Sequence, residues 1–135
     1  MSLEITSRTT EGITILDMRG RLVAGEETGK LRDYVNELVA KGPLNAVLNL
    51  ASIDFIDSTG LGAMVLCYSA AKKSGGALRL LNLKEREIEL LVLTKLNTIF
   101  EVFADEQDAV NSFYPDRAVK RFDILSFVQS HSPPE

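Results

Sequence analysis

The sequence contains almost none of the residues that disulfides, metal sites and most hydrolytic sites require. Its 135 residues include one cysteine, Cys67, one histidine, His131, and no tryptophan. A single cysteine excludes an intramolecular disulfide, and one cysteine with one histidine cannot supply a zinc cluster. Because His131 lies in a segment that we expect to fray, a Ser–His catalytic pair is also disfavoured. We therefore expect a protein that is not an enzyme, with no catalytic residue, no metal and no cofactor.

Long apolar runs and an excess of basic residues are absent as well. The first ten residues, MSLEITSRTT, contain no apolar stretch of the kind found in signal peptides. No run approaches the ~18 apolar residues that suggest a membrane span. The net charge of −4 argues against a surface that binds nucleic acid or anionic lipid, since both carry negative charge. We expect a cytoplasmic protein with no nucleic-acid partner and no insertion into a membrane.

What is present is a globular composition with alternating strand and helix patterns. Apolar residues make up 45% of the chain and charged residues 25%, and 135 residues fit one domain. The expected strands are Leu3–Thr9, Ile13–Gly20, Leu44–Leu50, Ala77–Leu81 and Ile99–Phe103. The expected helices lie within Gly25–Lys41, between Ser58 and Gly75, and within Lys84–Leu93 and Glu106–Phe113. Such alternation favours parallel pairing, with the first strand antiparallel at an edge. The sequence predicts one α/β domain over residues 1–113, with a mixed, mostly parallel sheet of four to five strands and about four helices.

Several other patterns have ordinary structural interpretations. The charged run Lys84 to Glu89 (KEREIE) is expected to be a solvated helix face with ion pairs. Cys67 falls in the middle of a helix beside core positions, which indicates a buried, inert thiol. Segment 25–30 (GEETGK) has its glycines too close together for a Walker motif, and segment 56–60 lacks the first glycine of a G-x-S-x-G elbow.

The C-terminal extension, residues 114–135, is distinct from the predicted domain. Its apolar side chains are spaced for an amphipathic helix after Pro115, and Ser130–Glu135 is expected to be a disordered end. The apolar stripe consists of Val119, Phe122, Leu125 and Phe127. Two interpretations stay open: the stripe docks on the domain itself, or it mediates contact with a partner or a homodimer.

The segment Asp57–Gly62 (DSTGLG) follows a predicted buried strand and begins a predicted helix. Aspartate and serine are favoured helix N-caps, so a purely structural cap is one interpretation. Two glycines in a first turn cost up to ~1 kcal/mol each in a helix interior, which makes sense where another group must approach the backbone closely. A helix N-terminus also favours an anion, so Ser58 could carry a phosphoryl group of about −1.5 to −2 charges without unfolding.

Two segments carry a resemblance to a known family. Phe55–Gly62 (FIDSTGLG), with Gly20-Arg21-Leu22, closely resembles the signature of STAS domains, specifically bacterial anti-sigma factor antagonists. The resemblance spans roughly Leu3 to Phe113 and implies the α/β fold of that family. It also implies a mechanism, in which the unphosphorylated protein binds an anti-sigma factor, often a serine protein kinase, and frees a sigma factor. Phosphorylation of Ser58 would block that binding, and a phosphatase would restore it.

The resemblance places the partner-binding residues in two segments. They are Val23, Glu26, Asp57, Ser58, Thr59, Gly60, Leu61 and Gly62, with Ser58 as the phosphorylation site. Two positions depart from the family pattern: Val23 stands where an acidic residue is common, and Asn49 stands where aspartate is frequent. Glu26 and Glu27 are close enough in sequence to replace the missing carboxylate. A second function therefore stays open, that of a constitutive STAS adaptor in a signalling scaffold or a lipid-transport ATPase complex.

Overall fold

Strands and helices alternate along the chain as the sequence predicts, and the structure, a computed structural model, describes residues 3–131. The strands are β1 Glu4–Thr10, β2 Ile13–Leu22, β3 Asn45–Ile56, β4 Ala77–Leu81 and β5 Val102–Phe103. The helices are α1 Glu26–Val39, α2 Ser58–Lys73, α3 Glu85–Leu93, the 3₁₀ turn η1 Leu96–Thr98, α4 Glu106–Asn111 and α5 Ile124–His131. The predicted disordered end is wrong for Ser130 and His131, which complete α5, and its remainder lies outside the described residues.

The five strands form one sheet in the order β1-β2-β3-β4-β5. The β1 strand pairs antiparallel with β2 at an edge, as predicted, and the other pairs are parallel. The β3 strand is longer than predicted, because residues 50–56 continue it along β2 through two register shifts. Pairing with β4 ends at Asn49. Residues 50–56 of β3 therefore have a strand neighbour on one side only.

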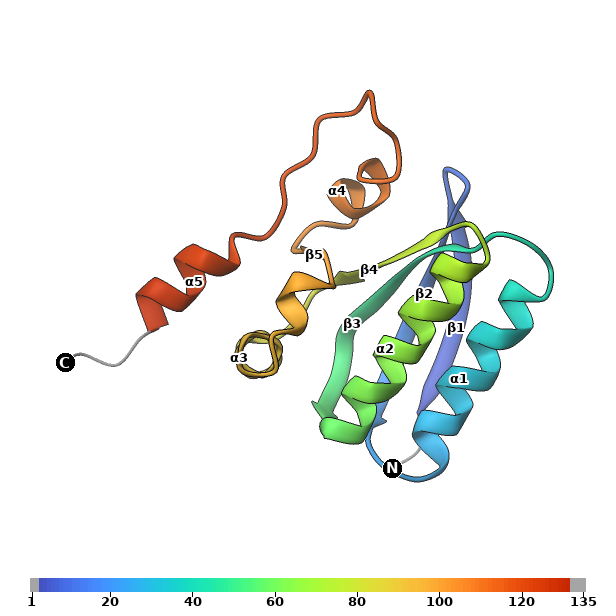
Figure 1. Ribbon diagram of the computed structural model, residues 1–135, viewed down its shortest axis with the longest axis horizontal. Coiled ribbons are helices and arrows are strands. Elements are labelled where there is room, and N and C mark those ends of the chain that lie inside the picture. Colours follow the sequence, from blue (N-terminus) through green and yellow to red (C-terminus); the bar gives the residue numbers. More distant parts are fainter. Residues whose placement is uncertain (1–2, 132–135) are drawn as a thin grey trace.

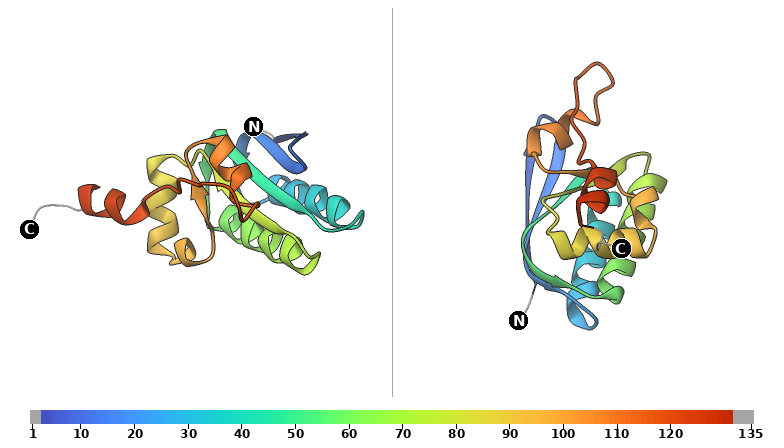
Figure 2. Two further views of the ribbon diagram at one scale, coloured as in Figure 1. Left: turned by 90° about the horizontal axis from the view of Figure 1, so that it is seen from above. Right: turned by 90° about the vertical axis from the view of Figure 1, so that its left-hand side faces the viewer.

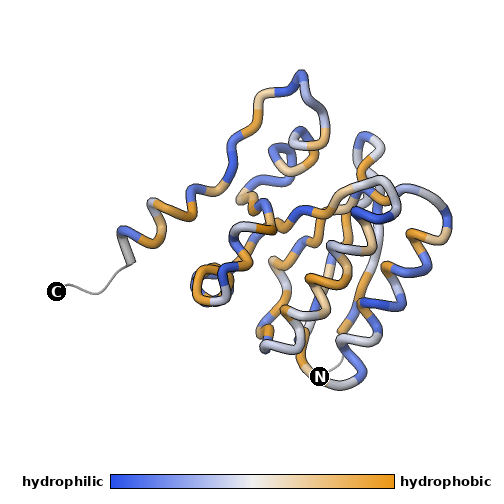
Figure 3. The backbone as a smooth tube through the Cα atoms, in the orientation of Figure 1, coloured by the Kyte–Doolittle hydropathy of each residue, from blue (hydrophilic) through white to orange (hydrophobic). Residues whose placement is uncertain are grey.

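Helices cover both faces of the sheet and divide the core in two. Helices α1 and α2 lie together on one face, as Figure 1 shows, and α4 lies on the other face in Figure 2. Alternation along β3 makes the division: Ala46 and Leu48 face the main core, whereas Val47 faces the smaller core with Ala109 and Val110 of α4. Such a strand, buried on both faces, reads as a continuous apolar run. In Figure 3 the central strands carry the colours of hydrophobic residues along much of their length.

Polar side chains bridge the strands on the face that α4 leaves partly open. Arg8 donates from Nε to Asp17 at 2.7 Å and also pairs with Glu106 of α4. Asn49 donates to Asp17 Oδ1 at 2.8 Å and accepts from Asn82 at 3.1 Å. The pKa of Asp17 is lowered, mainly by its hydrogen bond from Arg8. Asn49 thus bridges Asp17 and Asn82, where an aspartate would place a second carboxylate beside Asp17.

The C-terminal extension first runs along the free edge of β5 and then turns into a helix. The Phe122 N–H donates to Val102 O at 3.0 Å, and Phe122 packs against the main core. Val119 packs against the smaller core. The predicted helix is therefore wrong for these two residues, because their extended backbone covers an otherwise open sheet edge. Helix α5 begins at Ile124 and projects away from the domain in Figures 1 and 2.

Docking of the extension on its own domain gives a prediction for Phe122. Replacing it with alanine should lower the free energy of unfolding by about 1–2 kcal/mol, since a half-buried ring is lost from the core. Leu93→Ala is the control, because Leu93 is 79% exposed and its loss should change stability by less than ~0.5 kcal/mol. Urea denaturation measures both. Equal stability of the two variants would contradict the docking.

Candidate functional site

The junction between β3 and α2 is built around the carboxylate of Asp57. This residue is extended, with φ −96° and ψ −178°, and its side chain accepts a hydrogen bond from Gly60 N. That bond, 2.7 Å long, joins Oδ1 to the first turn of the helix. Asp57 is therefore the N-cap, as its residue type predicts. Ser58 is the first residue of α2, and its side chain is exposed.

The same carboxylate ties the start of α2 to the turn before α1. Its second oxygen, Oδ2, accepts a hydrogen bond from Ala24 N at 2.9 Å, and the Asp57 N–H donates to Leu22 O at 3.2 Å. The turn places half-buried Val23 next to Ala24, while Glu26 is exposed in the first turn of α1. The two segments that the sequence analysis singled out are thus brought together, although more than thirty residues separate them.

The two glycines of the junction have different surroundings. A Cβ on Gly60 would lie 2.1 Å from Leu22 O, so α2 approaches the end of β2 more closely than any other residue allows. A Cβ on Gly62 would meet nothing within 4 Å. The expected close approach is therefore real at Gly60, and the approaching group is the chain's own carbonyl. Gly60 and Leu61 are buried, whereas Ser58 and Thr59 are exposed and open to a partner.

Comparison with known proteins places this fold and junction in a family. A family model described as the STAS domain matches residues 4–109. The chain belongs to the STAS domain family. An anti-sigma-B factor antagonist of Bacillus subtilis is 41% identical over 61 residues, which cover 45% of this chain and 56% of that protein. An anti-sigma-B factor antagonist of Listeria monocytogenes is 28% identical over 106 residues, which cover 76% of this chain and 88% of that protein.

Solved structures share the fold of this STAS domain. An anti-sigma factor antagonist from Mycobacterium paratuberculosis has a TM-score of 0.71 at 20% identity, over 83% of this chain and 94% of its own. The Bacillus cell fate determinant SpoIIAA in its phosphorylated form has a TM-score of 0.62 at 17% identity, over 81% of this chain and 98% of its own. These likenesses confirm the predicted α/β fold.

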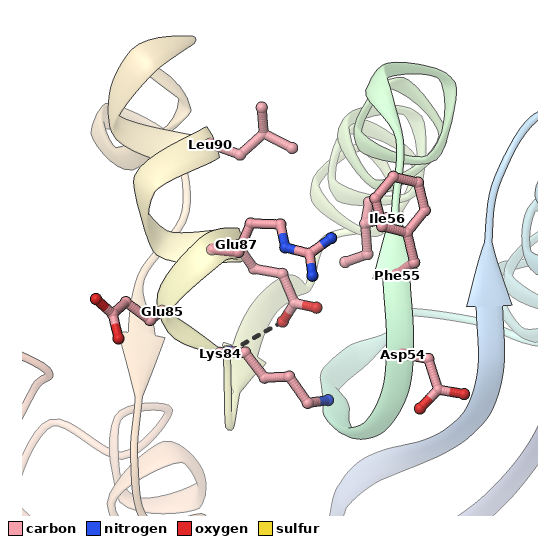
Figure 4. A pocket seen from close by; sticks show the side chains of 8 residues that line it. Asp54, Phe55, Ile56, Lys84, Glu85, Glu87 and Leu90 are labelled. Atoms are coloured by element: carbon pink, nitrogen blue, oxygen red, sulfur yellow. Dashed lines mark hydrogen bonds between the residues drawn. The ribbon is translucent and has the colours of Figure 1, made fainter.

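One cluster beside the junction of the STAS domain is not indicated by any pattern in the sequence. The guanidinium of Arg21 lies 5.8 Å from the centroid of the Phe55 ring, and that of Arg86 lies 5.4 Å from it. Figure 4 shows the groove between α3 and the end of β3 that this ring lines, about 160 Å³ in volume. Because Arg86 and Phe55 are far apart in sequence, no local pattern could have joined them.

The start of α3 also differs from the solvated face that its charges predict. Glu87 is buried, and its carboxylate accepts a hydrogen bond from Lys84 N at 2.9 Å, which caps the helix. Burial raises the pKa of Glu87. The Lys84 ammonium donates to the carbonyls of Ile53 and Ala51 on the side of β3 that lacks a strand neighbour. The prediction of a solvated face is therefore wrong for Glu87.

The hydrogen bonds of Asp57 give a prediction for stability and its pH dependence. The N–H groups of Ala24 and Gly60 lower the pKa of this carboxyl. A lowered folded-state pKa adds stability above the unfolded pKa of roughly 3.9, and that stability is lost as the pH falls through the folded pKa. The amide of Asp57→Asn cannot accept hydrogen bonds from both groups, so the free energy of unfolding should fall by about 1–2 kcal/mol at pH 7. On acidification the variant should lose less stability than the wild-type protein does.

Asp54→Asn is the matched control for this prediction. Asp54 is an exposed carboxylate in β3, three residues before Asp57, and within the described residues its side chain forms no hydrogen bond to α2 or to the turn before α1. Guanidinium unfolding at pH 7 and at pH 3 measures both variants. If Asp57→Asn behaves like Asp54→Asn at both pH values, the carboxylate does not stabilise the junction.

The STAS domain shows no group suited to metal binding within residues 3–131, where three or more His, Cys, Asp or Glu side chains nowhere converge. Cys67 is buried, as predicted, and burial raises its thiol pKa to about 12. The thiolate is the reactive form of cysteine, and a raised pKa keeps this thiol protonated and therefore inert. None of the helices in the same described range is long and apolar enough to cross a membrane.

Proposed function

We propose that this STAS domain protein is an anti-sigma factor antagonist, a binding protein rather than an enzyme. Its partner is an anti-sigma factor that is also a serine protein kinase, and binding releases a sigma factor. Binding takes place while Ser58 is unphosphorylated. Phosphorylation of Ser58 by that kinase switches the protein off, and a phosphatase restores it. The names of the relatives from Bacillus subtilis and Listeria monocytogenes support the partner class.

The observation that carries this proposal is the exposed position of Ser58 on a helix start that Asp57 already caps. The Asp57 oxygens accept from Ala24 and Gly60, so the fold does not depend on the Ser58 hydroxyl. A phosphoryl group there extends into solvent at a helix N-terminus, which tolerates an anion. It adds about −1.5 to −2 charges next to the Asp57 carboxylate. In a close-packed interface such a dianion causes repulsion and a desolvation cost, so the group changes binding and leaves folding intact.

The turn before α1 supplies the rest of the proposed contact surface. Val23 is half-buried and apolar, so it contributes packing rather than charge. Glu26 and Glu27 begin α1, and the hydrogen bond between Ala24 and Asp57 holds that turn against the start of α2. We assign to Glu26 the carboxylate that other family members carry at the position of Val23. Thr59 and Gly62 extend the exposed surface along α2, while Gly60 and Leu61 fix the helix beneath it.

Phosphorylation tests the proposal directly. The full chain is incubated with ATP and the kinase-type anti-sigma factor of its source organism, and phosphate is located by mass spectrometry. One phosphate is expected on Ser58. Thr59→Ala should still accept it, and Ser58→Ala should accept none, since the two hydroxyls are adjacent and both exposed. Phosphate on Thr59 in the wild-type protein, or on neither residue, would contradict the assignment of Ser58.

A second candidate function is a constitutive STAS adaptor in a signalling scaffold or a lipid-transport ATPase complex. The apolar side chain at Val23 favours it, because the kinase then lacks a carboxylate at that position. Affinity capture from a lysate of the source organism separates the two functions. If the protein is an adaptor, the wild-type chain and the Ser58→Asp variant would capture scaffold or transport proteins equally well. If it is an antagonist, the wild-type chain would capture an anti-sigma factor and the variant would not.

The C-terminal extension adds a proposal about self-association. Leu125 is exposed on α5, which projects from the domain, and a helix this short is marginal in water by itself. We propose that two α5 helices pack together in a homodimer. Sedimentation equilibrium should detect a dimer that Leu125→Ala weakens, and a wild-type protein that is monomeric at every concentration would exclude it.

A further inference from the structure

Two arginines contact one aromatic ring and form no ion pair with a carboxylate among residues 3–131. The guanidinium groups of Arg21 and Arg86 each lie within 6 Å of the Phe55 ring centroid. Both side chains are exposed, and within residues 3–131 neither of them forms an ion pair. The arginines that do pair with carboxylates are Arg8, Arg79, Arg117 and Arg121. Arg19 and Arg32 form no ion pair in the same residues either, so what distinguishes Arg21 and Arg86 is that both contact one ring. We call Arg21, Phe55 and Arg86 the Arg-Phe-Arg cluster.

The cluster borders the groove between α3 and the unpaired side of β3. Phe55, Ile56 and Leu90 give this groove an apolar lining. Beside it, the Lys84 ammonium donates hydrogen bonds to carbonyl groups of β3. Three carboxylates also line the groove, those of Asp54, Glu85 and Glu87. In Figure 4 those of Asp54 and Glu85 point away from its centre, whereas that of Glu87 lies between α3 and β3 and accepts a hydrogen bond from Lys84 N. The cluster thus combines unpaired guanidinium groups with an adjoining apolar surface.

The chemistry of the cluster fits a carboxylate-bearing segment of a protein partner. A guanidinium over a ring face is held in place while its in-plane N–H groups stay free, and these groups bind a carboxylate in bidentate fashion. Such an arrangement lowers the entropy cost of binding. Arginine and aromatic residues are also enriched at the residues that dominate protein interfaces. The occupant that suits the site is an Asp or Glu side chain with an apolar neighbour that enters the groove.

Position joins this cluster to the surface around Ser58. Phe55 lies three residues before Ser58, and Arg21 is its cross-strand neighbour in β2. The next residue in β2, Leu22, accepts a hydrogen bond from the Asp57 N–H. Both surfaces therefore lie at the same end of the sheet. A partner that extends from Ser58 across the ends of β2 and β3 would contact both surfaces.

We propose that the Arg-Phe-Arg cluster is a second contact area for the anti-sigma factor and receives a carboxylate-bearing segment of it. This inference rests on the proposed function. It adds a positively charged anchor to an interface whose other element, Ser58, is switched by a negative charge. Exposed charges of this kind act mainly through association rate and salt dependence.

Titration of the anti-sigma factor with the full chain tests the cluster. The variant Arg21→Gln/Arg86→Gln should bind about tenfold more weakly at low salt and lose part of the salt dependence of binding. Lys72→Gln/Lys73→Gln is the charge-matched control, because both lysines are exposed in the last turn of α2, roughly 21 Å or more along the helix from Ser58. It should bind like the wild-type protein. Circular dichroism confirms that both variants are folded.

The outcomes separate this inference from the proposed function. If the wild-type protein binds and the double variant binds with the same affinity and salt dependence, the cluster is not a contact area. If Lys72→Gln/Lys73→Gln weakens binding as much as the double arginine variant does, the effect reports overall charge and the inference is wrong. If the wild-type protein binds no anti-sigma factor, the proposed function fails and the second contact area with it.

Discussion

Gly60→Ala is expected to lower the free energy of unfolding by about 3 kcal/mol, at the upper end of what overpacking costs. The added Cβ would lie 2.1 Å from Leu22 O and 3.0 Å from a methyl carbon of Ile56. The first of these contacts is with backbone, so no side-chain rotation relieves it. Helix α2 must move away from β2, and the hydrogen bond from the Asp57 N–H to Leu22 O lengthens as it does.

Gly62→Ala is the control for this variant, two residues further along the same helix. Its Cβ meets no atom within 4 Å, and alanine is the better helix former by up to ~1 kcal/mol. We therefore expect a small gain in stability. Urea denaturation followed by circular dichroism gives both values. Equal stabilities for the two alanine variants would show that α2 does not approach β2 as closely as described.

Ser58→Asp is expected to weaken binding to the anti-sigma factor by about a hundredfold, which is close to 2.7 kcal/mol. Its stability should stay within ~0.5 kcal/mol of the wild-type value, because Ser58 is exposed and the helix is capped by Asp57. The loss of affinity then reports charge in the interface and not unfolding. Isothermal titration with the purified anti-sigma factor measures the affinity.

Ser58→Asn separates the charge of the aspartate from its size. Asparagine has nearly the same shape as aspartate and carries no charge, so its affinity should fall less than tenfold. If Ser58→Asn and Ser58→Asp lose the same affinity, steric bulk at the helix start explains the loss. If neither variant loses affinity, the surface around Ser58 is not where the anti-sigma factor binds.

The parts of the fold that local sequence determines were predicted well. The helix start at Asp57 follows from a capping residue after an apolar strand, and both features lie within a few residues. The hairpin of β1 and β2 follows from the turn at Glu11-Gly12, where both φ angles are positive. The alternation of strands with helices then led to the mostly parallel sheet.

The errors arose where a distant segment decides the local structure. The apolar residues around Phe122 are spaced as in a helix, but its backbone N–H donates a hydrogen bond to Val102 O at the free edge of β5. Glu87 has the charge of a solvated residue, but packing of α3 buries it. Neither β5 nor the surroundings of α3 can be read from the sequence around these residues.

The candidate site was predicted in the same uneven way. The sequence indicated the surface around Ser58, because its motif is contiguous. It gave no sign of the cluster at Phe55, whose two arginines come from β2 and α3. The close contact between Gly60 and Leu22 O could not be predicted from the sequence either, because only the pairing of β2 with β3 brings the two residues together.

The most direct test of the proposed function is release of a sigma factor from its complex with the anti-sigma factor. The full chain is added in two forms, unphosphorylated and phosphorylated on Ser58, and free sigma factor is measured by fluorescence anisotropy. We predict release at near-stoichiometric amounts of the unphosphorylated form, and about a hundredfold higher requirement for the phosphorylated form. Equal release by both forms, or no release by either, would contradict a Ser58-controlled antagonist.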